Sequence, residues 1–305
     1  MKFNITYMGD INFLNFQRDW LLLIAYGLQD LGHAVVISHN ELDSGKTINI
    51  ICHGVHNLAK DKVHHIINSN VNYGVIPGEL IISRTINNRS QFDGESARVS
   101  TDFDNSYFPY LRSADFIWCV MEHNIKELPK YELKPSGFLR FGFHPRLQEI
   151  KLLPDEYKDN DVYFFGLLTE DRRNILRTIQ EKGLKILLHD YDNPTLSFVR
   201  NSYINRSKII LNLAQNTGFR HMSGIRIVYL VTNHCYGLCE YVDIDDGGYL
   251  KFSDMAHSSK IAEKCLEVIE TKTYLGLAEE KHELIREFPM RNYLEELLDK
   301  TFGSG

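Results

Sequence analysis

The chain has 305 residues with 34 Lys or Arg and 40 Asp or Glu, so its formal net charge is −6. At about 150 residues per domain this length predicts two domains, and the ordinary apolar and charged fractions exclude disordered and fibrous classes. Five cysteines without paired spacing indicate a reducing compartment and argue against a disulfide scaffold or a zinc ribbon. The apolar runs are too short to span a bilayer, and the first residues, MKFNITYMGD, predict a strand and not a signal peptide.

In the first half of the chain, apolar runs of strand length alternate with segments of helical period. Residues 3–8 predict a strand, residues 14–31 a helix that stops at Gly32, and residues 34–38 a second strand, which together make a β-α-β unit. The polar segment 84–109 predicts a functional or mobile loop, because such long loops are uncommon in compact domains. Further strands are expected at residues 48–52, 72–76, 115–120 and 138–143, and helices at 58–69 and 122–132.

The alternation restarts after a charged, proline-containing segment, residues 147–160, which predicts an interdomain linker. The expected strands are 161–166, 184–188, 207–213 and 236–240, and the expected helices are 170–182, 195–206, 224–232 and a helical tail over 258–300. The sequence thus predicts an α/β fold with Rossmann-like domains at residues 1–146 and 161–285. A C-terminal helix in 286–305 would close the chain and cross back to the N-terminal domain.

Several stretches of the sequence resemble glycosyltransferases of the two-Rossmann (GT-B) type. DVYFFGLLTEDRRNILRTIQEKGLKILL is similar to the first strand, glycine turn and arginine-bearing helix of their donor-binding domain. SKIILNLAQN and SGIRIVYLVTNHCYGLCE resemble the stretch that holds the donor nucleotide, and ADFIWCV with GFLRFGFHP resembles the last strands before the interdomain crossing. Within this type, the chain resembles bacterial spore-maturation and envelope-glycan enzymes and the phage DNA β-glucosyltransferase.

The resemblance implies two Rossmann-like domains facing a central cleft. It also implies transfer of a hexosyl or pentosyl group from a nucleotide sugar to a hydroxyl, without a metal or a cofactor. Arginines and helix N-termini would neutralise the diphosphate that leaves, with Arg173 and Arg226 in the main roles. The residues expected at the donor site are Gly9, Gly166, Arg172, Arg173, Asn212, Asn216, Ser223, Gly224, Arg226, Tyr229 and Glu240.

Two positions depart from the pattern of the family. Many members carry two glutamates eight residues apart, and this chain has His221 and Tyr229 there. A tyrosine hydroxyl cannot grip two ribose hydroxyls as a carboxylate can, so an altered donor or a lost activity is expected. Glu240 is a substitute carboxylate, and Asn212 and Asn216 are expected to read the base or the sugar. A nucleotide-sugar-binding module without catalysis therefore remains an alternative.

Two carboxylates in the first half are candidates for catalysis. Glu79 follows the expected strand 72–76, and α/β sheets hold reactive groups at such strand ends. Asp10 follows Gly9 on the first β-α turn. An inverting transfer, which is the expected outcome, needs one carboxylate to take the acceptor's proton, and the other would hold the sugar. Lesser candidates are His53, Asp102 and Asp104.

Asp-x-Asp triplets occur at residues 102–104, 190–192 and 243–245. Paired carboxylates can hold a divalent cation on a diphosphate, but arginines replace the metal in the two-Rossmann type, so no metal is expected.

Two classes of acceptor remain open. A bacterial surface glycan or a lipid-linked sugar suits an acidic chain, and the net charge favours it. A hydroxymethylated DNA base, the phage-type alternative, needs a basic groove and base flipping. The basic residues that would supply such a groove are Lys60, Lys62, Arg84, Arg89 and Arg98. The expected location is the cytoplasm, of a bacterium or of a phage-infected host.

Overall fold

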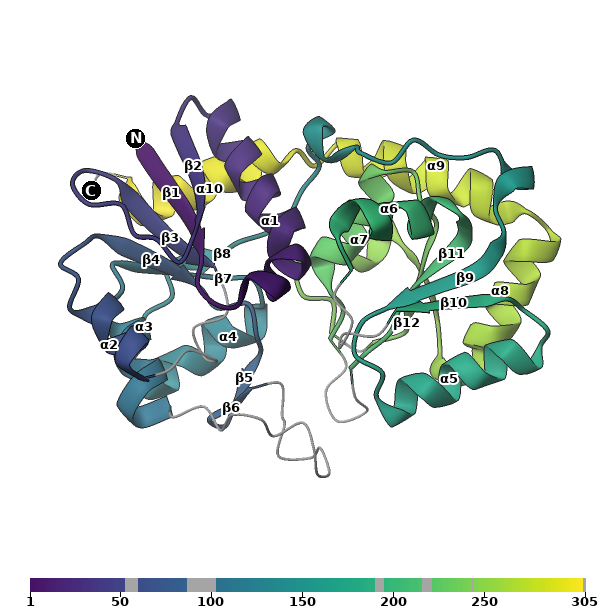
Figure 1. Ribbon diagram of the computed structural model, residues 1–305, viewed down its shortest axis with the longest axis horizontal. Helices are drawn as coiled ribbons and strands as arrows, with labels where there is room; N and C mark the ends of the chain where they lie inside the picture. Colours follow the sequence, from purple (N-terminus) through teal and green to yellow (C-terminus); the bar gives the residue numbers. More distant parts are fainter. Residues whose placement is uncertain (53–59, 87–102, 190–194, 216–220, 243, 304–305) are drawn as a thin grey trace. The chain divides into compact units, whose positions relative to one another are not determined.

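A computed structural model describes residues 1–52, 60–86, 103–189, 195–215, 221–242 and 244–303 (Figure 1). The chain divides into two compact units. The first unit combines Met1–Arg140 with Met290–Gly305, and the second unit is Phe141–Pro289. The expected architecture of two Rossmann-like α/β domains is confirmed, since each unit is built on a parallel sheet with helices on both faces. None of the helices in the described ranges is long and apolar enough to cross a membrane.

The sheet of the first unit has the strand order β2-β1-β3-β4-β7-β8, and all its pairings are parallel. Its central strands are buried on both faces, which explains why they read as continuous apolar runs. The strands are β1 (Lys2–Tyr7), β2 (Ala34–His39), β3 (Ile48–Cys52), β4 (Tyr73–Ile76), β7 (Phe116–Cys119) and β8 (Gly137–Phe138).

Helices α1 and α10 cover one face of this sheet, and α2, α3 and α4 lie on the other (Figure 1). Their bounds are α1 (Ile11–Asp30), α2 (Lys60–Ile67), α3 (Phe108–Ser113), α4 (Glu122–Glu127) and α10 (Met290–Phe302). The expected stop of α1 at Gly32 is confirmed. Gly32 has φ +80°. Its N–H donates to the carbonyl of Gln29 and the next N–H to the carbonyl of Leu28, as in a Schellman motif.

Two glycines allow α10 to pack closely against the rest of the first unit. A Cβ on Gly27 of α1 would lie 2.5 Å from Cδ1 of Leu294, and a Cβ on Gly137 would lie 2.6 Å from Cδ1 of Leu297. Both leucines are buried. The helix that returns from the second unit therefore fills space that the first 140 residues leave open.

The expected polar loop at residues 84–109 is partly wrong. The short strands β5 (Ile81–Ile82) and β6 (Thr85–Ile86) form an antiparallel hairpin, and a π-helical turn, Phe103–Tyr107, leads into α3. The sequence Phe-Pro-Tyr-Leu conceals this helix, because proline disfavours a helix interior but is tolerated in the first turn. The buried side chains of Phe103, Tyr107 and Phe108 join the core cluster of the first unit, and residues 87–102 lie outside the described ranges. The expected strand 138–143 is limited to β8, because the chain leaves the first unit after Arg140.

The sheet of the second unit has the order β10-β9-β11-β12-β13, again all parallel. Its strands are β9 (Asn160–Phe165), β10 (Ile186–His189), β11 (Ser207–Asn212), β12 (Gly237–Glu240) and β13 (Asp254–Ala256), the last of which the sequence pattern did not predict. Its helices are α5 (Glu170–Glu181), α6 (Ser197–Asn205), α7 (Gly224–Thr232), α8 (Ile261–Glu270) and α9 (Thr273–Arg286). Along β9, Val162 and Phe164 join the core under α5 and α8, whereas Tyr163 faces Tyr203 of α6 with ring centroids 5.9 Å apart.

The segment expected as a linker, residues 147–160, is hydrogen bonded within the second unit. The buried Oδ1 of Asn233, after α7, accepts the backbone N–H groups of Glu149 at 2.7 Å and Ile150 at 2.8 Å. The N–H of Leu153 donates to Oδ1 of Asn205 at 2.7 Å. Two asparagine side chains at helix ends thus replace the ladder partners that this extended segment lacks.

Replacing Leu294 by Ala should lower the unfolding free energy by about 2–5 kcal/mol, the usual cost of deleting a buried leucine. Urea unfolding followed by circular dichroism measures this loss. Leu275→Ala on α9 is the matched control, because its side chain is 47% exposed. Equal effects of the two substitutions would contradict the docking of α10 on α1.

Candidate functional site

The strand order of the second unit fixes where a ligand can bind. From β9 the chain goes to β10 on one side and then to β11 on the other, so the order reverses between β9 and β11. In open α/β sheets the crevice at the carboxyl ends of such a pair is the usual ligand site. Gly166 directly follows β9, and Asn212 is the last residue of β11. Both expected donor-site residues therefore lie at this switch point.

Two guanidinium groups converge on Gly166. Its φ of +138° lies in a region that favours glycine. A Cβ built on it would lie 3.5 Å from Nη2 of Arg226 and 3.7 Å from Nη1 of Arg172. Arg172 comes from the first turn of α5 and Arg226 from the first turn of α7. The loop after β9 is thus flanked by two positive charges and two helix N-termini, an arrangement that suits a phosphate anion.

Arg172 is a buried cation held by backbone carbonyls. Its Nε donates to the carbonyl of Ala214 at 2.9 Å, its Nη2 to that of Leu213 at 2.6 Å, and its Nη1 to that of Leu167 at 2.8 Å. Burial, and secondarily the charge of Arg226, lower the pKa of Arg172 to about 9, so the side chain stays protonated at neutral pH. Arg172 therefore joins the loops after β9 and β11 and leaves a net positive charge there.

Arg226 lies at the same switch point. Its guanidinium carbon is 4.2 Å from the ring centroid of Phe165, and its Nη1 is 3.5 Å from Oδ1 of Asn212. The side chain is half-buried. Stacking on an aromatic ring helps to hold a guanidinium in place, and a guanidinium matches phosphate oxygens in pairs. Arg226 is therefore a candidate for contact with an anionic ligand at the switch point.

Arg173 lies differently from its neighbour Arg172. Its side chain is 59% exposed and sits 4.0 Å from Glu170 one turn earlier, in an ion pair of the kind that contributes little to stability. Consecutive helical residues point about 100° apart, as follows from 3.6 residues per turn. One arginine of the pair is therefore buried in the site and the other faces solvent.

Glu240, at the end of β12, is buried beside these arginines. Its Oε2 accepts the backbone N–H of Ala214 at 3.0 Å, and its charge partly offsets the depression of the Arg172 pKa. The carboxylate thus fixes the loop after β11 and balances a nearby cation.

Ser223 and Gly224 lie at the start of α7, as expected, but the Ser223 side chain does not cap the helix. The carbonyl of Ser223 accepts from Nδ2 of Asn212 at 3.5 Å. A Cβ on Gly224 would lie 2.4 Å from the ring of Tyr249, so only glycine lets that ring pack against the helix start.

Both positions that depart from the family pattern bind other residues of the second unit. The hydroxyl of Tyr229 lies 2.8 Å from Oδ1 of Asn201 and 3.2 Å from Oε2 of Glu149. Nδ1 of His221 lies 3.1 Å from Oδ2 of Asp246. Each side chain therefore has a polar partner of its own where the family has a glutamate.

Arg200 of α6 was not predicted as a site residue. Its guanidinium carbon lies 4.6 Å from the ring centroid of Tyr229 and 6.0 Å from that of Phe165, and the residue is only 8% exposed. Its burial could have been predicted from helical spacing, because Arg200 lies one turn before the core residue Ile204 on the same face of α6. A charged residue on the buried face of a helix is rare unless it is paired or functional.

In the first unit, Gly9 and Asp10 occupy the turn between β1 and α1. The strand order also reverses next to β1 in this sheet. The N–H of Gly9 donates to Oδ1 of Asn40 at 2.9 Å, and its carbonyl accepts from Nδ2 of the same side chain at 3.0 Å. Asp10 is exposed and directly precedes α1. The side chain of Asn40, the residue after β2, thus holds the backbone of this turn, and the Asp10 carboxylate comes directly after it.

Glu79 lies just beyond β4, as expected, and is half-buried. Its carbonyl accepts from Nδ2 of Asn124 at 2.9 Å, and Oδ1 of that side chain accepts the N–H of Ile81 at 3.0 Å. Burial and, second, the charge of Glu79 raise the pKa of Tyr107. Asn124 thus fixes the backbone of this loop, and the Glu79 carboxylate is close enough to Tyr107 to influence its pKa.

Several expected residues lie outside the described ranges: His53, Asp102, Asp190, Asp192, Asn216 and Asp243. Two other members of the Asp-x-Asp triplets have local partners. Asp104 pairs with Arg84 at 2.8 Å, and Oδ1 of Asp245 accepts the N–H of Leu250 at 3.1 Å. Over the described part of the chain, no group of three or more His, Cys, Asp or Glu residues is arranged to hold a metal ion.

No family model and no curated protein matches the chain. Among solved structures it is similar to an alpha-glucosyltransferase in complex with UDP, with a TM-score of 0.57 and 10% identity over 99% of both chains. An alpha-glucosyltransferase in complex with UDP and a 13-mer DNA containing an HMU base gives a TM-score of 0.56 and 9% identity, over 97% of this chain and 99% of that one. The N-terminal domain of a Candida albicans trehalose-6-phosphate phosphatase gives 0.51 and 12%, over 93% and 76%. The expected resemblance to the two-Rossmann glycosyltransferases is thereby confirmed at the level of the fold.

Arg172→Ala should lower the unfolding free energy by about 3 kcal/mol or more, because each buried carbonyl left without a donor costs about 1–3 kcal/mol. Arg173→Ala, its matched neighbour, should change it by less than about 0.5 kcal/mol, as is usual for exposed positions. Denaturant unfolding of both variants tests this contrast. A large loss for Arg173→Ala, or none for Arg172→Ala, would refute the assigned roles.

Proposed function

We propose that this protein is a glycosyltransferase that moves a sugar from a nucleotide-sugar donor to a hydroxyl acceptor. The observation that carries the proposal is the convergence of Arg172 and Arg226 on Gly166 at the switch point of the second unit. This site offers positive charge, helix N-termini and close backbone approach, which a nucleotide diphosphate requires. The likeness in fold to a glucosyltransferase in complex with UDP supports the same donor chemistry.

The roles of the arginines follow from the negative charge that develops on the leaving diphosphate. The bond between the anomeric carbon and the diphosphate oxygen breaks, and the leaving diphosphate gains negative charge. Arg226 and the first N–H groups of α7 would bind that charge directly, whereas Arg172, held by three carbonyls, would add a fixed positive potential. The proposal assigns charge neutralisation to these groups and invokes no metal and no cofactor.

The acceptor needs a base as its hydroxyl attacks the anomeric carbon. We assign this role to Glu79, because its loop is fixed by Asn124 and its carboxylate is partly shielded from solvent. Asp10 is exposed directly after a turn whose backbone Asn40 holds, and it is the candidate for holding the donor sugar. A base that deprotonates the acceptor in a single displacement gives inversion, which is therefore part of the proposal.

A DNA base that carries a hydroxymethyl group is the acceptor that the comparisons favour. One similar structure is an alpha-glucosyltransferase bound to DNA with an HMU base, and the likeness spans 97% of this chain. The glycan or lipid-linked acceptor rests on the resemblance to envelope-glycan enzymes and on the net charge of −6, which does not exclude a local basic surface. Both acceptors are tested in the transfer assay below. A binding module without catalysis would transfer sugar to neither of them.

Binding of the donor can be tested without knowing the acceptor. A nucleotide at 100 times its Kd should stabilise the protein by about 2.7 kcal/mol, which gives a readable rise in Tm. We expect this rise with UDP in a panel that also contains GDP, CMP and dTDP. Arg226→Ala should reduce the rise strongly, and Arg173→Ala should leave it unchanged. Equal responses of the two variants would refute the assignment of Arg226.

Transfer can be tested with radiolabelled UDP-glucose and two acceptors, an oligonucleotide with hydroxymethylated pyrimidines and a lipid-linked saccharide. Glu79→Gln should lower kcat by about 10²–10⁴-fold, the usual contribution of a general base, while UDP still raises the Tm. Asp10→Asn should mainly raise KM for the donor. NMR of the product gives the anomeric configuration, and retention would overturn the assignment of Glu79 as base in a single displacement.

A further inference from the structure

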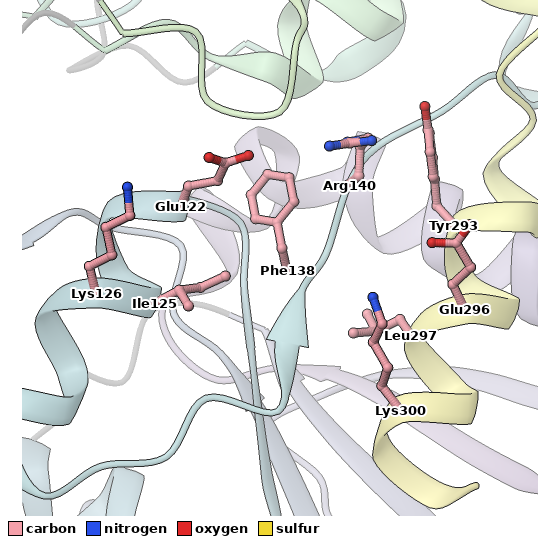
Figure 2. A pocket seen from close by; sticks show the side chains of 9 residues that line it. All are labelled: Glu122, Ile125, Lys126, Phe138, Arg140, Tyr293, Glu296, Leu297 and Lys300. Carbon is pink, nitrogen blue, oxygen red and sulfur yellow. The ribbon is translucent and has the colours of Figure 1, made fainter.

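The first unit contains a pocket that the proposed function does not use. Its volume is about 310 Å³, within the size range of small-molecule sites. The side chains of α4 lie on one side of Phe138, and those of α10 lie on the other (Figure 2). The residues that line it are Glu122, Ile125, Lys126, Phe138, Arg140, Tyr293, Glu296, Leu297 and Lys300.

Arg140 is framed by two aromatic rings in this pocket. Its guanidinium carbon lies 5.7 Å from the ring centroid of Phe138 and 5.2 Å from that of Tyr293. Its Nε is buried and has no hydrogen-bond acceptor among the described residues. The aromatic rings position this cation but do not neutralise its charge. An anion bound in the pocket would therefore stabilise the charged guanidinium.

Charges of both signs line the pocket without pairing. Lys126 and Lys300 add to Arg140, and Glu122 and Glu296 face them from the same two helices. No ion pair within 4.0 Å joins any of these five side chains to a described residue. Three cations and two carboxylates leave one net positive charge. Unpaired opposite charges around a common space suit a ligand that carries an anionic group together with hydrogen-bond donors.

We propose that this pocket binds a monosaccharide phosphate. The phosphate would be held by Arg140, Lys126 and Lys300. The apolar face of the sugar ring would pack on the aromatic side chains, and its hydroxyls would donate to the carboxylates. A nucleic acid strand fits poorly, because the two carboxylates repel a polyanion and the volume accommodates one sugar unit. The proposal does not depend on the donor site of the second unit.

Isothermal titration with glucose 6-phosphate tests the proposal, with UDP present at saturation to occupy the donor site. We expect binding of glucose 6-phosphate and at least tenfold weaker binding of glucose and of inorganic phosphate. Lys300→Gln should weaken binding about tenfold, equal to about 1.4 kcal/mol. Lys300 is exposed, so the variant should fold normally. Lys260→Gln, at an exposed lysine of the second unit, is the matched control and should bind as the unmodified protein does.

Each other outcome overturns part of the proposal. If inorganic phosphate binds as tightly as glucose 6-phosphate, the pocket is an anion site that does not recognise the sugar. Tyr293→Ala should then leave the affinity for glucose 6-phosphate unchanged. A short single-stranded DNA is tested in the same way. If it binds to the protein and Lys300→Gln abolishes that binding, the ligand of the pocket is a nucleic acid and not a monosaccharide phosphate. Absence of binding, or equal binding by the Lys300 and Lys260 variants, would refute the site.

Discussion

The site of the second unit depends on one buried interaction, the three hydrogen bonds from Arg172 to the carbonyls of Leu167, Leu213 and Ala214. They join the loops that follow β9 and β11, the two strands where the order of the sheet reverses. The bonds satisfy carbonyls that have no partner in a strand ladder, and they hold a full positive charge in a place with little water. Because the carbonyls are neutral, that charge remains to act on whatever enters the crevice.

The rest of the crevice is arranged around that charge. The charge of Glu240 partly offsets that of Arg172, and its carboxylate accepts the backbone N–H of Ala214. Arg226, stacked on the ring of Phe165, adds a second positive charge. The two arginines differ in their surroundings. Arg172 is buried and donates to three carbonyls, whereas Arg226 is half-buried and stacks on an aromatic ring.

Hydrophobic periodicity and glycine positions predicted the sheets, most helices and the arginine-bearing turn, because these features depend on local sequence. Gly166 and Arg226 were predicted as site residues from the resemblance to two-Rossmann glycosyltransferases, and they follow a strand end and open a helix, respectively. Helical spacing could have identified the buried arginine of the pair, because Arg172 lies three, four and seven residues before the core residues Ile175, Leu176 and Ile179. The spacing of Arg200 to Ile204 indicates its burial, but its ring partners, Tyr229 and Phe165, come from other parts of the chain and could not be predicted from local sequence. The helix α3 was concealed by a proline in its first turn.

The return of α10 to the first unit has a consequence for biosynthesis. The second unit is contiguous in the sequence, whereas the first is interrupted by 149 residues, Phe141–Pro289. A ribosome therefore delivers everything that the second unit needs before it delivers α10, so the second unit can finish folding first, against the usual N-to-C order. Until then the groove at Gly27 and Gly137 stays open on a nascent sheet. The unfinished first unit therefore keeps this apolar surface uncovered during translation, until Leu294 and Leu297 of α10 cover it.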